Sequence, residues 1–267
     1  MPDTAATPNV PAQSLLSERR GAICLLTLNE PQRRNALSLP LRELLHDHLA
    51  AAMDDPEVRA IVITGAEQTF CAGGDLRSME GVTPPAARDR LRRAHRLVRL
   101  IVRGNKPVIA AVEGDAAGAG LALAAACDLV IAAESARFTA AFDRVGLMPD
   151  LGALWSIPAR IGTSAARRLL LLGETFDGTA AAACGLADRV TGSGEALTDA
   201  LAAAERLAKG APLAIASVKA LLARAPQGLD ALLDSEAEAQ AVLFGSEDFA
   251  EGRSAFLEKR KPRFSGR

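Results

Sequence analysis

Histidine and cysteine, which often bind metals or carry out nucleophilic chemistry, are scarce in this chain of 267 residues. It has three histidines and four cysteines. The cysteines Cys24, Cys71, Cys127 and Cys184 are far apart, form no CxxC pair and lie among apolar or alanine residues. We expect reduced thiols that pack as small hydrophobic side chains. No metal site and no histidine-based catalytic triad is predicted.

The chain also lacks a strong net charge and long apolar runs. Its formal charge is −1, so the whole molecule has no field that would attract nucleic acid or an anionic membrane. The apolar runs are too short to span a bilayer, and the N-terminus has no charged region followed by an apolar core. These absences predict a cytoplasmic protein that binds neither nucleic acid nor membrane.

One local charge concentration is present. Residues 85–102 have a helical pattern in which seven arginines, counting Arg103 just beyond it, alternate with apolar positions. This pattern is typical of a solvated helix face, and a local attraction for a phosphorylated ligand is the alternative. No aromatic residues interleave with the arginines to support base stacking.

The chain is organised around residues 106–138. An apolar strand is expected over 107–112, followed by a turn with Gly114, Gly118 and Gly120, an alanine-rich helix and a second strand over 129–133. The same order of strand, glycine loop and helix occurs earlier, with a strand over 58–64 and a loop over 70–76. This recurrence predicts a right-handed βα coil with parallel strands, hence an α/β fold.

The remaining patterns predict a strand over 21–28 and a helix over 39–53. They also predict an irregular section over 138–158 and a helix over 164–172. Strands are absent after about residue 200, and helices are expected over 199–209, 215–223 and 229–244. The predicted division is a flexible tail (1–13), an α/β core (14–200) and a helical oligomerisation region (201–267) whose exposed apolar positions cover a neighbouring copy.

The two glycine loops predict a backbone site for an oxygen that carries or acquires negative charge. Each loop follows an aliphatic strand, and ligands of parallel sheets bind at that end of the strands. The first N–H groups of a helix have no internal partner, and glycine lets a ligand approach the backbone closely. The N–H groups of Gly74 and Ala119 are expected to converge on one carbonyl oxygen and stabilise it as an enolate.

At this point the chain resembles the crotonase, or enoyl-CoA hydratase/isomerase, superfamily. The resemblance extends over most of the chain, and the matching segments are 35–37, 70–76, 106–112, Gly114 with 118–120, 127–129, Gly146-Leu147 with Pro149, 157–158 with Gly162, 185–186 and much of 248–262. It implies a crotonase-like spiral of ββα turns with a C-terminal helical trimerisation region. It also implies a homotrimer or a hexamer of paired trimers, and an acyl-CoA thioester as substrate. Coenzyme A is part of that substrate, so no separate cofactor is expected.

The resemblance assigns roles to individual residues. Gly74 and Ala119 would bind the thioester oxygen, Ala72 and Leu76 would line the path of coenzyme A, and Arg33 and Arg34 would border the nucleotide. The full set of expected substrate-binding residues is Arg33, Arg34, Ala36, Ala72, Asp75, Leu76, Ala122, Phe142 and Leu147.

The resemblance also reveals two departures. The positions of the two hydratase glutamates are occupied by Ala122 and Phe142, neither of which can accept a proton, so efficient hydration is not expected. Asp150 stands where most hydratases have glycine. A similar Pro-Asp segment occurs in isomerases of the superfamily that resemble epoxyphenylacetyl-CoA isomerase, where the aspartate shuttles the proton.

The sequence therefore favours an isomerase that moves a double bond through a thioester enolate, with Asp150 as proton shuttle. Asp150 could instead cap a helix or turn near Leu151. Asp115 and Asp143 are less well placed, and Glu113 is expected outside the site. Two other functions stay open: an enoyl-CoA hydratase with a different water-positioning group, and an acyl-CoA-binding protein without chemistry.

Overall fold

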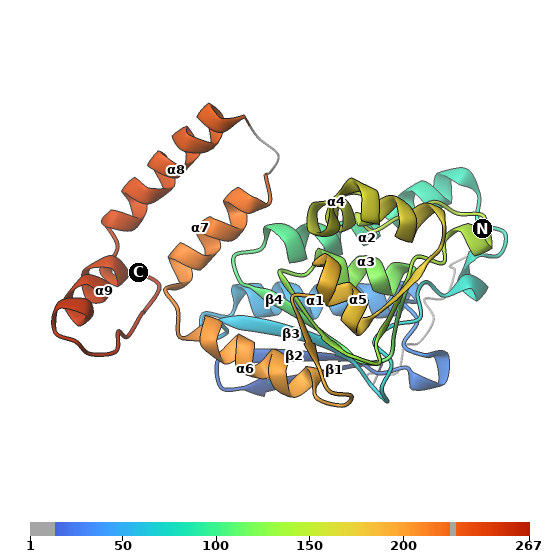
Figure 1. Ribbon diagram of the computed structural model, residues 1–267, viewed down its shortest axis with the longest axis horizontal. Coiled ribbons are helices and arrows are strands. Elements are labelled where there is room, and N and C mark those ends of the chain that lie inside the picture. The colour runs from blue at the N-terminus through green and yellow to red at the C-terminus, as the bar shows by residue number, and fades with distance from the viewer. Residues whose placement is uncertain (1–13, 225–227) are drawn as a thin grey trace, which may run out of the picture.

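The computed structural model describes residues 14–224 and 228–267, so the tail expected over 1–13 lies outside the described residues. Within them, the main sheet has six strands in the order β1-β2-β3-β4-β6-β9. Figure 1 labels the first four of them. Five of these strands (β2, β3, β4, β6 and β9) run parallel and confirm the predicted parallel sheet, whereas β1 pairs antiparallel with β2. The bounds are β1 Leu15–Arg20, β2 Ile23–Leu28, β3 Ala60–Gly65, β4 Val108–Val112, β6 Leu129–Ala133 and β9 Arg189–Thr191.

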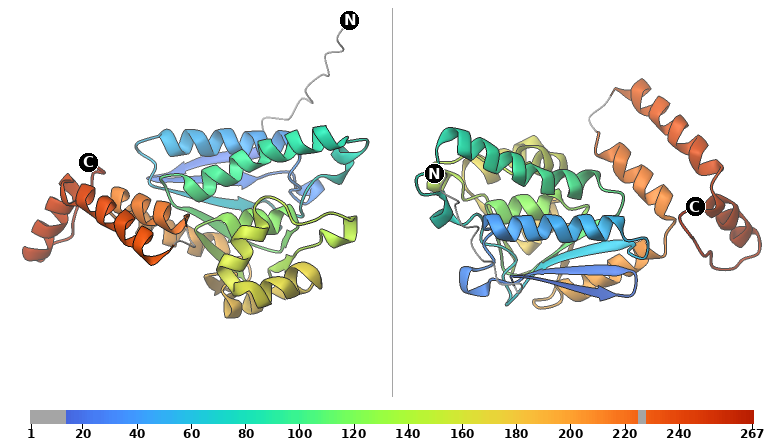
Figure 2. Two further views of the ribbon diagram at one scale, coloured as in Figure 1. Left: turned by 90° about the horizontal axis from the view of Figure 1, so that it is seen from above. Right: turned by 180° about the vertical axis from the view of Figure 1, so that it is seen from behind.

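Helices cover both faces of this sheet, which explains why its strands are continuous aliphatic runs. On one face, Ile61 and Ile63 pack with the apolar stripes of α1 (Leu39–Asp54) and α2 (Pro84–Arg103) and with α3 (Ala119–Ala126). On the other face, Ala60 and Val62 pack against α6 (Ala196–Ala208). Figure 2 shows α1 and α2 together on one side of the sheet.

A second, smaller sheet extends the first. It contains β5 (Asp115–Ala117), β7 (Arg137–Thr139) and β8 (Thr175–Asp177), in that order. β5 follows β4 closely and β7 follows β6 closely, so each long strand continues into a short strand of the second sheet before the chain turns back. This arrangement matches the expected spiral of ββα turns.

One helix prediction is wrong. The structure has α4 over Ala153–Leu171, so residues 153–163, expected to be irregular or unassigned, are helical apart from a kink. The kink is at Gly162, whose φ of 70° and ψ of 165° are not helical, and Pro158 also lies inside the helix. Because proline and glycine interrupt helical patterns, only the second half of α4 had a recognisable signal. The short elements β5, β7, β8, α5 (Gly178–Cys184) and β9 were not predicted.

Of the C-terminal helices, those over Pro212–Leu222 and Leu229–Phe244 confirm the prediction, whereas the one over Glu247–Leu257 was not predicted. These helices are α7 (Pro212–Leu222), α8 (Leu229–Phe244) and α9 (Glu247–Leu257), here called the C-terminal arm, and they extend away from the sheet (Figure 1). The division at residue 200 stays a prediction, and α6, which spans it, packs on the sheet. Among the described residues, no helix combines the length and apolar character needed to cross a bilayer.

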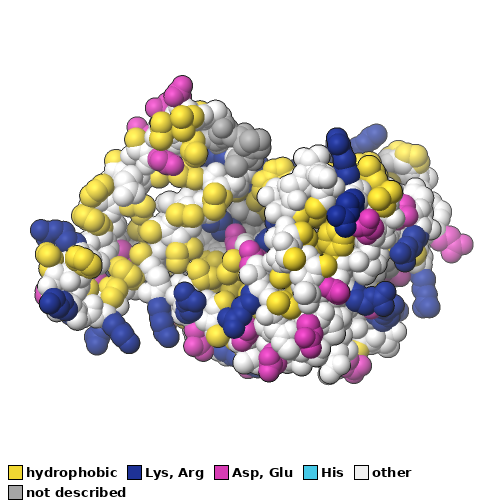
Figure 3. All heavy atoms as spheres, in the orientation of Figure 1, with side chains coloured by type: hydrophobic (Ala, Val, Ile, Leu, Met, Phe, Trp, Pro, Cys, Tyr) yellow, Lys and Arg dark blue, Asp and Glu magenta, His cyan; other side chains and the backbone are white. Residues whose placement is uncertain are grey.

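Many apolar side chains of the arm are exposed, and Figure 3 shows them gathered over its helices. Val242 is 72% exposed and Phe256 is 83% exposed. A groove between α7 and α8 is lined mainly by apolar side chains, including Val218, Leu222 and Leu233. A single copy of the chain leaves this surface uncovered.

Candidate active site

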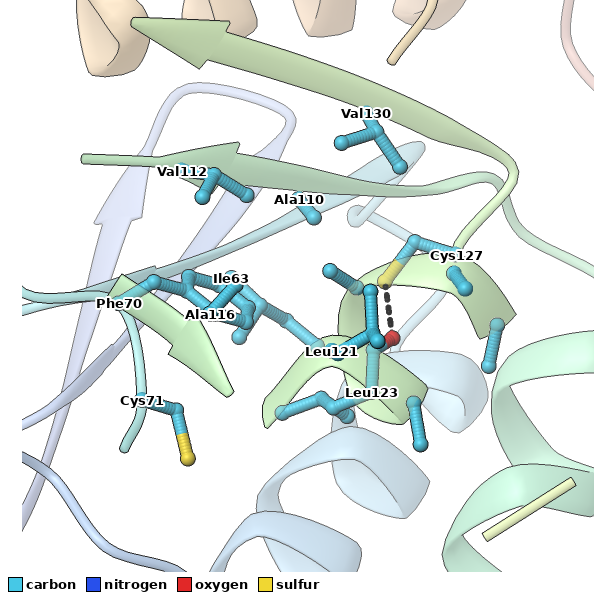
Figure 4. Packing of buried hydrophobic residues seen from close by; sticks show 14 of the residues in the cluster. Ile63, Phe70, Cys71, Ala110, Val112, Ala116, Leu121, Leu123, Cys127 and Val130 are labelled. Carbon is cyan, nitrogen blue, oxygen red and sulfur yellow. Dashed lines mark hydrogen bonds between the residues drawn. The ribbon is translucent and has the colours of Figure 1, made fainter. Parts of the chain in front are cut away.

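The two glycine loops lie side by side at the ends of neighbouring strands β3 and β4. The N–H of Phe70 donates to the Glu113 carbonyl at 2.8 Å, and the N–H of Ala117 donates to the Cys71 carbonyl at 2.9 Å. Figure 4 shows Phe70 and Cys71 beside the short strand that carries Ala116. The predicted convergence of the two loops is confirmed.

Glycines permit this close approach. A Cβ on Gly120 would lie 2.2 Å from the Cys71 carbonyl oxygen, which is too short for any real contact. A Cβ on Gly73 would lie 3.1 Å from the Ala117 carbonyl oxygen and 3.8 Å from the Ala119 nitrogen. Gly73 also has a φ of +114°, which side-chain-bearing residues rarely adopt. The loop that carries Gly74 is therefore held against the start of α3.

The N–H groups of Gly74 and Ala119, here called the donor pair, are available to a ligand. Neither donates a hydrogen bond to any protein atom among the described residues. Ala119 is the first residue of α3, where the N–H groups have no partner within the helix. The preceding Gly118 provides no side-chain cap. The arrangement leaves main-chain hydrogens free for the oxygen of a carbonyl group.

The segment after β2 is tied to the same loop. The N–H of Ala72 donates to the Arg34 carbonyl at 3.0 Å, and the N–H of Leu37 donates to the Gly73 carbonyl at 2.7 Å. Arg34 forms an ion pair with Asp115. Three segments that are distant in sequence, around residues 35, 73 and 117, thus meet at the donor pair.

The other residues expected to bind substrate differ in exposure. Arg33, Leu76 and Leu147 are exposed, whereas Ala36, Ala72 and Asp75 are partly buried. The Asp75 carboxylate accepts a hydrogen bond from the N–H of Arg77 at 3.2 Å and caps the short helix η2 (Leu76–Met79). Asp75 therefore has a local structural task beside any contact with substrate.

No carboxylate stands at the two positions where the resemblance implies glutamates. Ala122 is fully buried within α3, and the Phe142 side chain is only 8% exposed. The Phe142 carbonyl accepts the N–H groups of Val145 and Leu147, at 3.2 and 3.0 Å. Phe142 therefore fixes the start of the segment that leads to Asp150.

Asp150 is partly buried between the short helix η3 (Asp143–Val145) and α4. Its side chain does not cap α4, because the cap residue is Gly152 and no side chain caps this helix. Only the main-chain carbonyl of Asp150 contributes to the start of α4, by accepting a hydrogen bond from the N–H of Ala153 at 2.9 Å. One carboxylate oxygen of Asp150 is buried and has no hydrogen-bond partner among the described residues. The capping role considered from the sequence is not what the geometry favours.

Burial and neighbouring charged groups have opposite effects on the pKa of Asp150. Burial raises the pKa of the Asp150 carboxyl above its usual range, because desolvation penalises the charged form. Electrostatic interactions with Arg42, His95 and Arg90 oppose this rise in pKa. A carboxyl in such surroundings can take up a proton and release it again.

Two other acidic residues near the loops, Glu113 and Asp115, already have partners within the protein. Glu113 lies outside the site, as expected, and its carboxylate accepts the N–H groups of Gly194 and Ala196 at 3.1 and 2.9 Å. Asp115 pairs with Arg34. Within the described residues, no group of three or more histidine, cysteine, aspartate or glutamate side chains is arranged to hold a metal ion.

Sequence reasoning missed Arg42, which is only 4% exposed and contributes to the charge around Asp150. The position of Arg42 in the apolar pattern of α1 could have indicated that this arginine is buried. Arg42 is three residues before Leu45 and seven before Leu49, so it lies on the buried stripe of that helix. A charged residue on an apolar stripe is unusual unless it has a partner there.

Comparisons with known proteins agree with this geometry. The sequence profile described as enoyl-CoA hydratase/isomerase matches residues 18–267. The 2,3-dehydroadipyl-CoA hydratase of Escherichia coli K12 is 38% identical over 254 residues, which cover 95% of this chain and 99% of that protein. The 1,2-epoxyphenylacetyl-CoA isomerase of the same organism is 36% identical over 258 residues, which cover 95% of this chain and 98% of that protein.

A solved structure shares the fold as well. An enoyl-CoA hydratase from Polaromonas sp. JS666 superposes with a TM-score of 0.90 at 37% sequence identity, covering 94% of this chain and 99% of that chain. The sequence match over nearly the whole length and the shared architecture lead to one assignment. The chain belongs to the enoyl-CoA hydratase/isomerase family, within the crotonase superfamily.

Proposed function

We propose that this chain is an acyl-CoA isomerase that moves a carbon–carbon double bond, with Asp150 as the proton shuttle. The observation that carries the proposal is the Asp150 carboxyl, which has a buried oxygen without a hydrogen-bond partner among the described residues. Its raised pKa suits a group that takes a proton from carbon and later returns it. One such group is enough for an isomerisation.

The donor pair supplies the other half of the mechanism. The thioester carbonyl oxygen would accept hydrogen bonds from Gly74 and Ala119, which makes the protons next to the thioester, or conjugated with it, more acidic. Asp150 removes one of these protons, the electron pair is delocalised onto the thioester oxygen as an enolate, and the proton returns to a different carbon. Each donor to such an oxyanion typically contributes ~10²–10³ in rate. Coenzyme A enters as part of the substrate, so the proposed reaction needs no cofactor.

Hydration is the second candidate, because relatives at similar identity are named hydratases. It needs one group to deprotonate water and a path that delivers a proton to carbon. With alanine at 122 and phenylalanine at 142, both tasks would fall to Asp150 or to another group. We therefore expect little hydration of crotonyl-CoA.

Incubation of crotonyl-CoA with the purified protein in deuterated water separates the candidates. An isomerase places deuterium on the α or γ carbon without forming much 3-hydroxyacyl-CoA. A hydratase forms that hydroxy product at a substantial rate, and a binding protein without chemistry gives neither. Hydration at a substantial rate, or no exchange while the thioester binds, would contradict the proposal.

We also propose that the C-terminal arm covers a second copy of the chain, as expected for a homotrimer or a hexamer. Its exposed apolar side chains and the groove between α7 and α8 support this proposal. Sedimentation equilibrium should give three or six times the monomer mass of 27.8 kDa. A monomer at micromolar concentration would contradict it. Location in the cytoplasm stays a prediction of the sequence.

A further inference from the structure

Arg42 is a buried cation at the junction of the two halves of the proposed site. It is 4% exposed, and its Nε donates to the Leu37 carbonyl at 3.1 Å. Among the described residues, no carboxylate lies close enough to form a direct ion pair with it. Burial lowers the pKa of the Arg42 guanidinium, and the charge of Asp150 opposes that effect. A buried guanidinium without a direct ion pair carries a desolvation cost that no adjacent carboxylate offsets.

The guanidinium lies against the loop that carries the donor pair. A Cβ built on Gly74 would be 3.4 Å from a terminal nitrogen of Arg42. Leu37, whose carbonyl holds Arg42, itself donates its N–H to the Gly73 carbonyl at 2.7 Å. Arg42 is therefore bound to the peptide that fixes the Gly73-Gly74 loop, with its charge beside Gly74.

We propose that Arg42 is a positioning residue for this reaction, which fixes the Gly74 loop through Leu37 and directs its positive charge toward Asp150. The inference rests on the proposed function, since it needs Asp150 as the base. With its charge, Arg42 keeps the carboxylate in the ionised form that can accept a proton. Through its hydrogen bond to Leu37, it keeps one member of the donor pair in place.

The other charged or titratable groups around these side chains must be considered. From α2, Arg90 and His95 also act electrostatically on Asp150. Arg90 donates to the carbonyl and hydroxyl of Ser78, at 3.1 and 2.8 Å, so its guanidinium is engaged at η2. Arg42 in turn interacts electrostatically with Asp150, Arg90 and Cys71. Burial raises the pKa of the Cys71 thiol to about 11, so this thiol stays neutral.

Two substitutions separate the charge of Arg42 from its hydrogen bond. Arg42→Gln removes the charge, so the acidic limb of the pH profile for deuterium exchange into crotonyl-CoA should move to higher pH. At pH values below the displaced limb, its rate should be about tenfold lower for each pH unit of displacement, because only the ionised carboxylate can accept a proton. Arg42→Lys keeps the charge but not the guanidinium contact with Leu37. Its acidic limb should stay in place while kcat falls severalfold.

Controls make the result specific. Arg93→Gln removes an exposed arginine of α2 and should leave both kcat and the pH profile unchanged. His95→Asn tests whether the acidic limb belongs to that histidine, in which case the limb would disappear in this variant. Calorimetric binding of crotonyl-CoA should be retained in Arg42→Gln, since a positioning role affects kcat more than substrate affinity.

Clear outcomes would overturn the inference. An unchanged acidic limb in Arg42→Gln, or a limb in Arg42→Lys displaced as far as in Arg42→Gln, would remove the role of the charge. If Arg42→Gln does not fold, Arg42→Lys decides alone, and an unchanged kcat or a displaced limb contradicts the proposal. Full exchange by Asp150→Asn would instead remove the proposed function itself, so the two failures can be told apart.

Discussion

The two halves of the proposed site are built by different means. The donor pair is main chain, and its loops are held by backbone hydrogen bonds and by glycines that pack against the core. The Asp150 segment (residues 143–152) depends on side chains. Its apolar residues Val145, Leu147 and Met148 are 44%, 52% and 68% exposed, and Leu151 has a left-handed φ of 51°.

This difference suggests a division of tasks. The donor pair would be a feature common to the family, whereas the Asp150 segment would determine which reaction is catalysed. Under the proposed mechanism, main-chain donors held by a spiral fold would bind any thioester carbonyl, whatever the acyl group. The chemistry that follows would depend on which side chain reaches the bound carbon, and that side chain is proposed to lie on a segment that exposes several of its apolar residues. Substitutions in the first half should therefore damage folding and activity together, whereas substitutions in the second should affect turnover alone.

The largest effect is expected from Asp150→Asn. The amide cannot accept a proton, so deuterium exchange into crotonyl-CoA should fall by ~10²–10⁴. Thioester binding, measured by calorimetry, should be kept because the donor pair is intact. Asp143→Asn, an exposed aspartate of the same segment, serves as the matched control and should retain full exchange. Unchanged turnover in Asp150→Asn would exclude Asp150 from the mechanism.

Gly120→Ala tests the half built from main chain. Because its Cβ would lie 2.2 Å from the Cys71 carbonyl oxygen, the two loops must separate. We expect the free energy of unfolding to fall by about 3 kcal/mol, with loss of thioester binding, as measured by urea denaturation and calorimetry. In Gly245→Ala, a new Cβ would have its nearest contact at 3.5 Å, and the stability should change by less than about 0.5 kcal/mol. Equal losses of stability in Gly120→Ala and Gly245→Ala would contradict the close packing of the two loops.

The pH dependence of exchange should report on Asp150. The base must be ionised to accept a proton, so the rate falls when the pH drops below its pKa. Because burial raises the pKa of this carboxyl, the fall should begin at a higher pH than for an ordinary aspartate. Below that pKa, kcat/KM should decrease about tenfold for each pH unit. A rate that stays constant or increases on acidification would be inconsistent with a carboxylate base.

The smallest effect is expected from exposed charge at the edge of the site. Arg33 is exposed and Arg34 already pairs with Asp115. Arg33→Gln should raise the Kd for coenzyme A thioesters by no more than about fivefold, and less at high salt, because exposed charges are screened. Surface-plasmon binding at two ionic strengths checks this. A loss of turnover with unchanged binding would assign Arg33 another task.

The sequence predicted the parts of the molecule that follow periodic patterns. The buried strands β3, β4 and β6 and the helices α1, α2 and α8 have clear apolar patterns, and their bounds differ from the prediction by no more than two residues. The convergence of the loops also followed from strand order. Three-residue strands such as β5 and β7 have no pattern of their own, because pairing with distant segments defines them.

The charge arrangement around Asp150 was not predictable in the same way. Arg42, Arg90 and His95 come from two helices that are distant in sequence from Asp150, and only the packing of α1 and α2 brings their charges to it. The first half of α4 was missed for a local reason, because Pro158 and Gly162 hide its periodicity. Residues that act through long-range electrostatics need the fold before they can be recognised.

The most direct test of the account is a crystal structure with bound crotonyl-CoA, because the whole mechanism starts from the position of one oxygen. We predict that the thioester oxygen lies about 2.7–3.1 Å from both the Gly74 and the Ala119 nitrogen, with Asp150 facing the acyl carbons. A thioester carbonyl directed away from this donor pair would contradict the account.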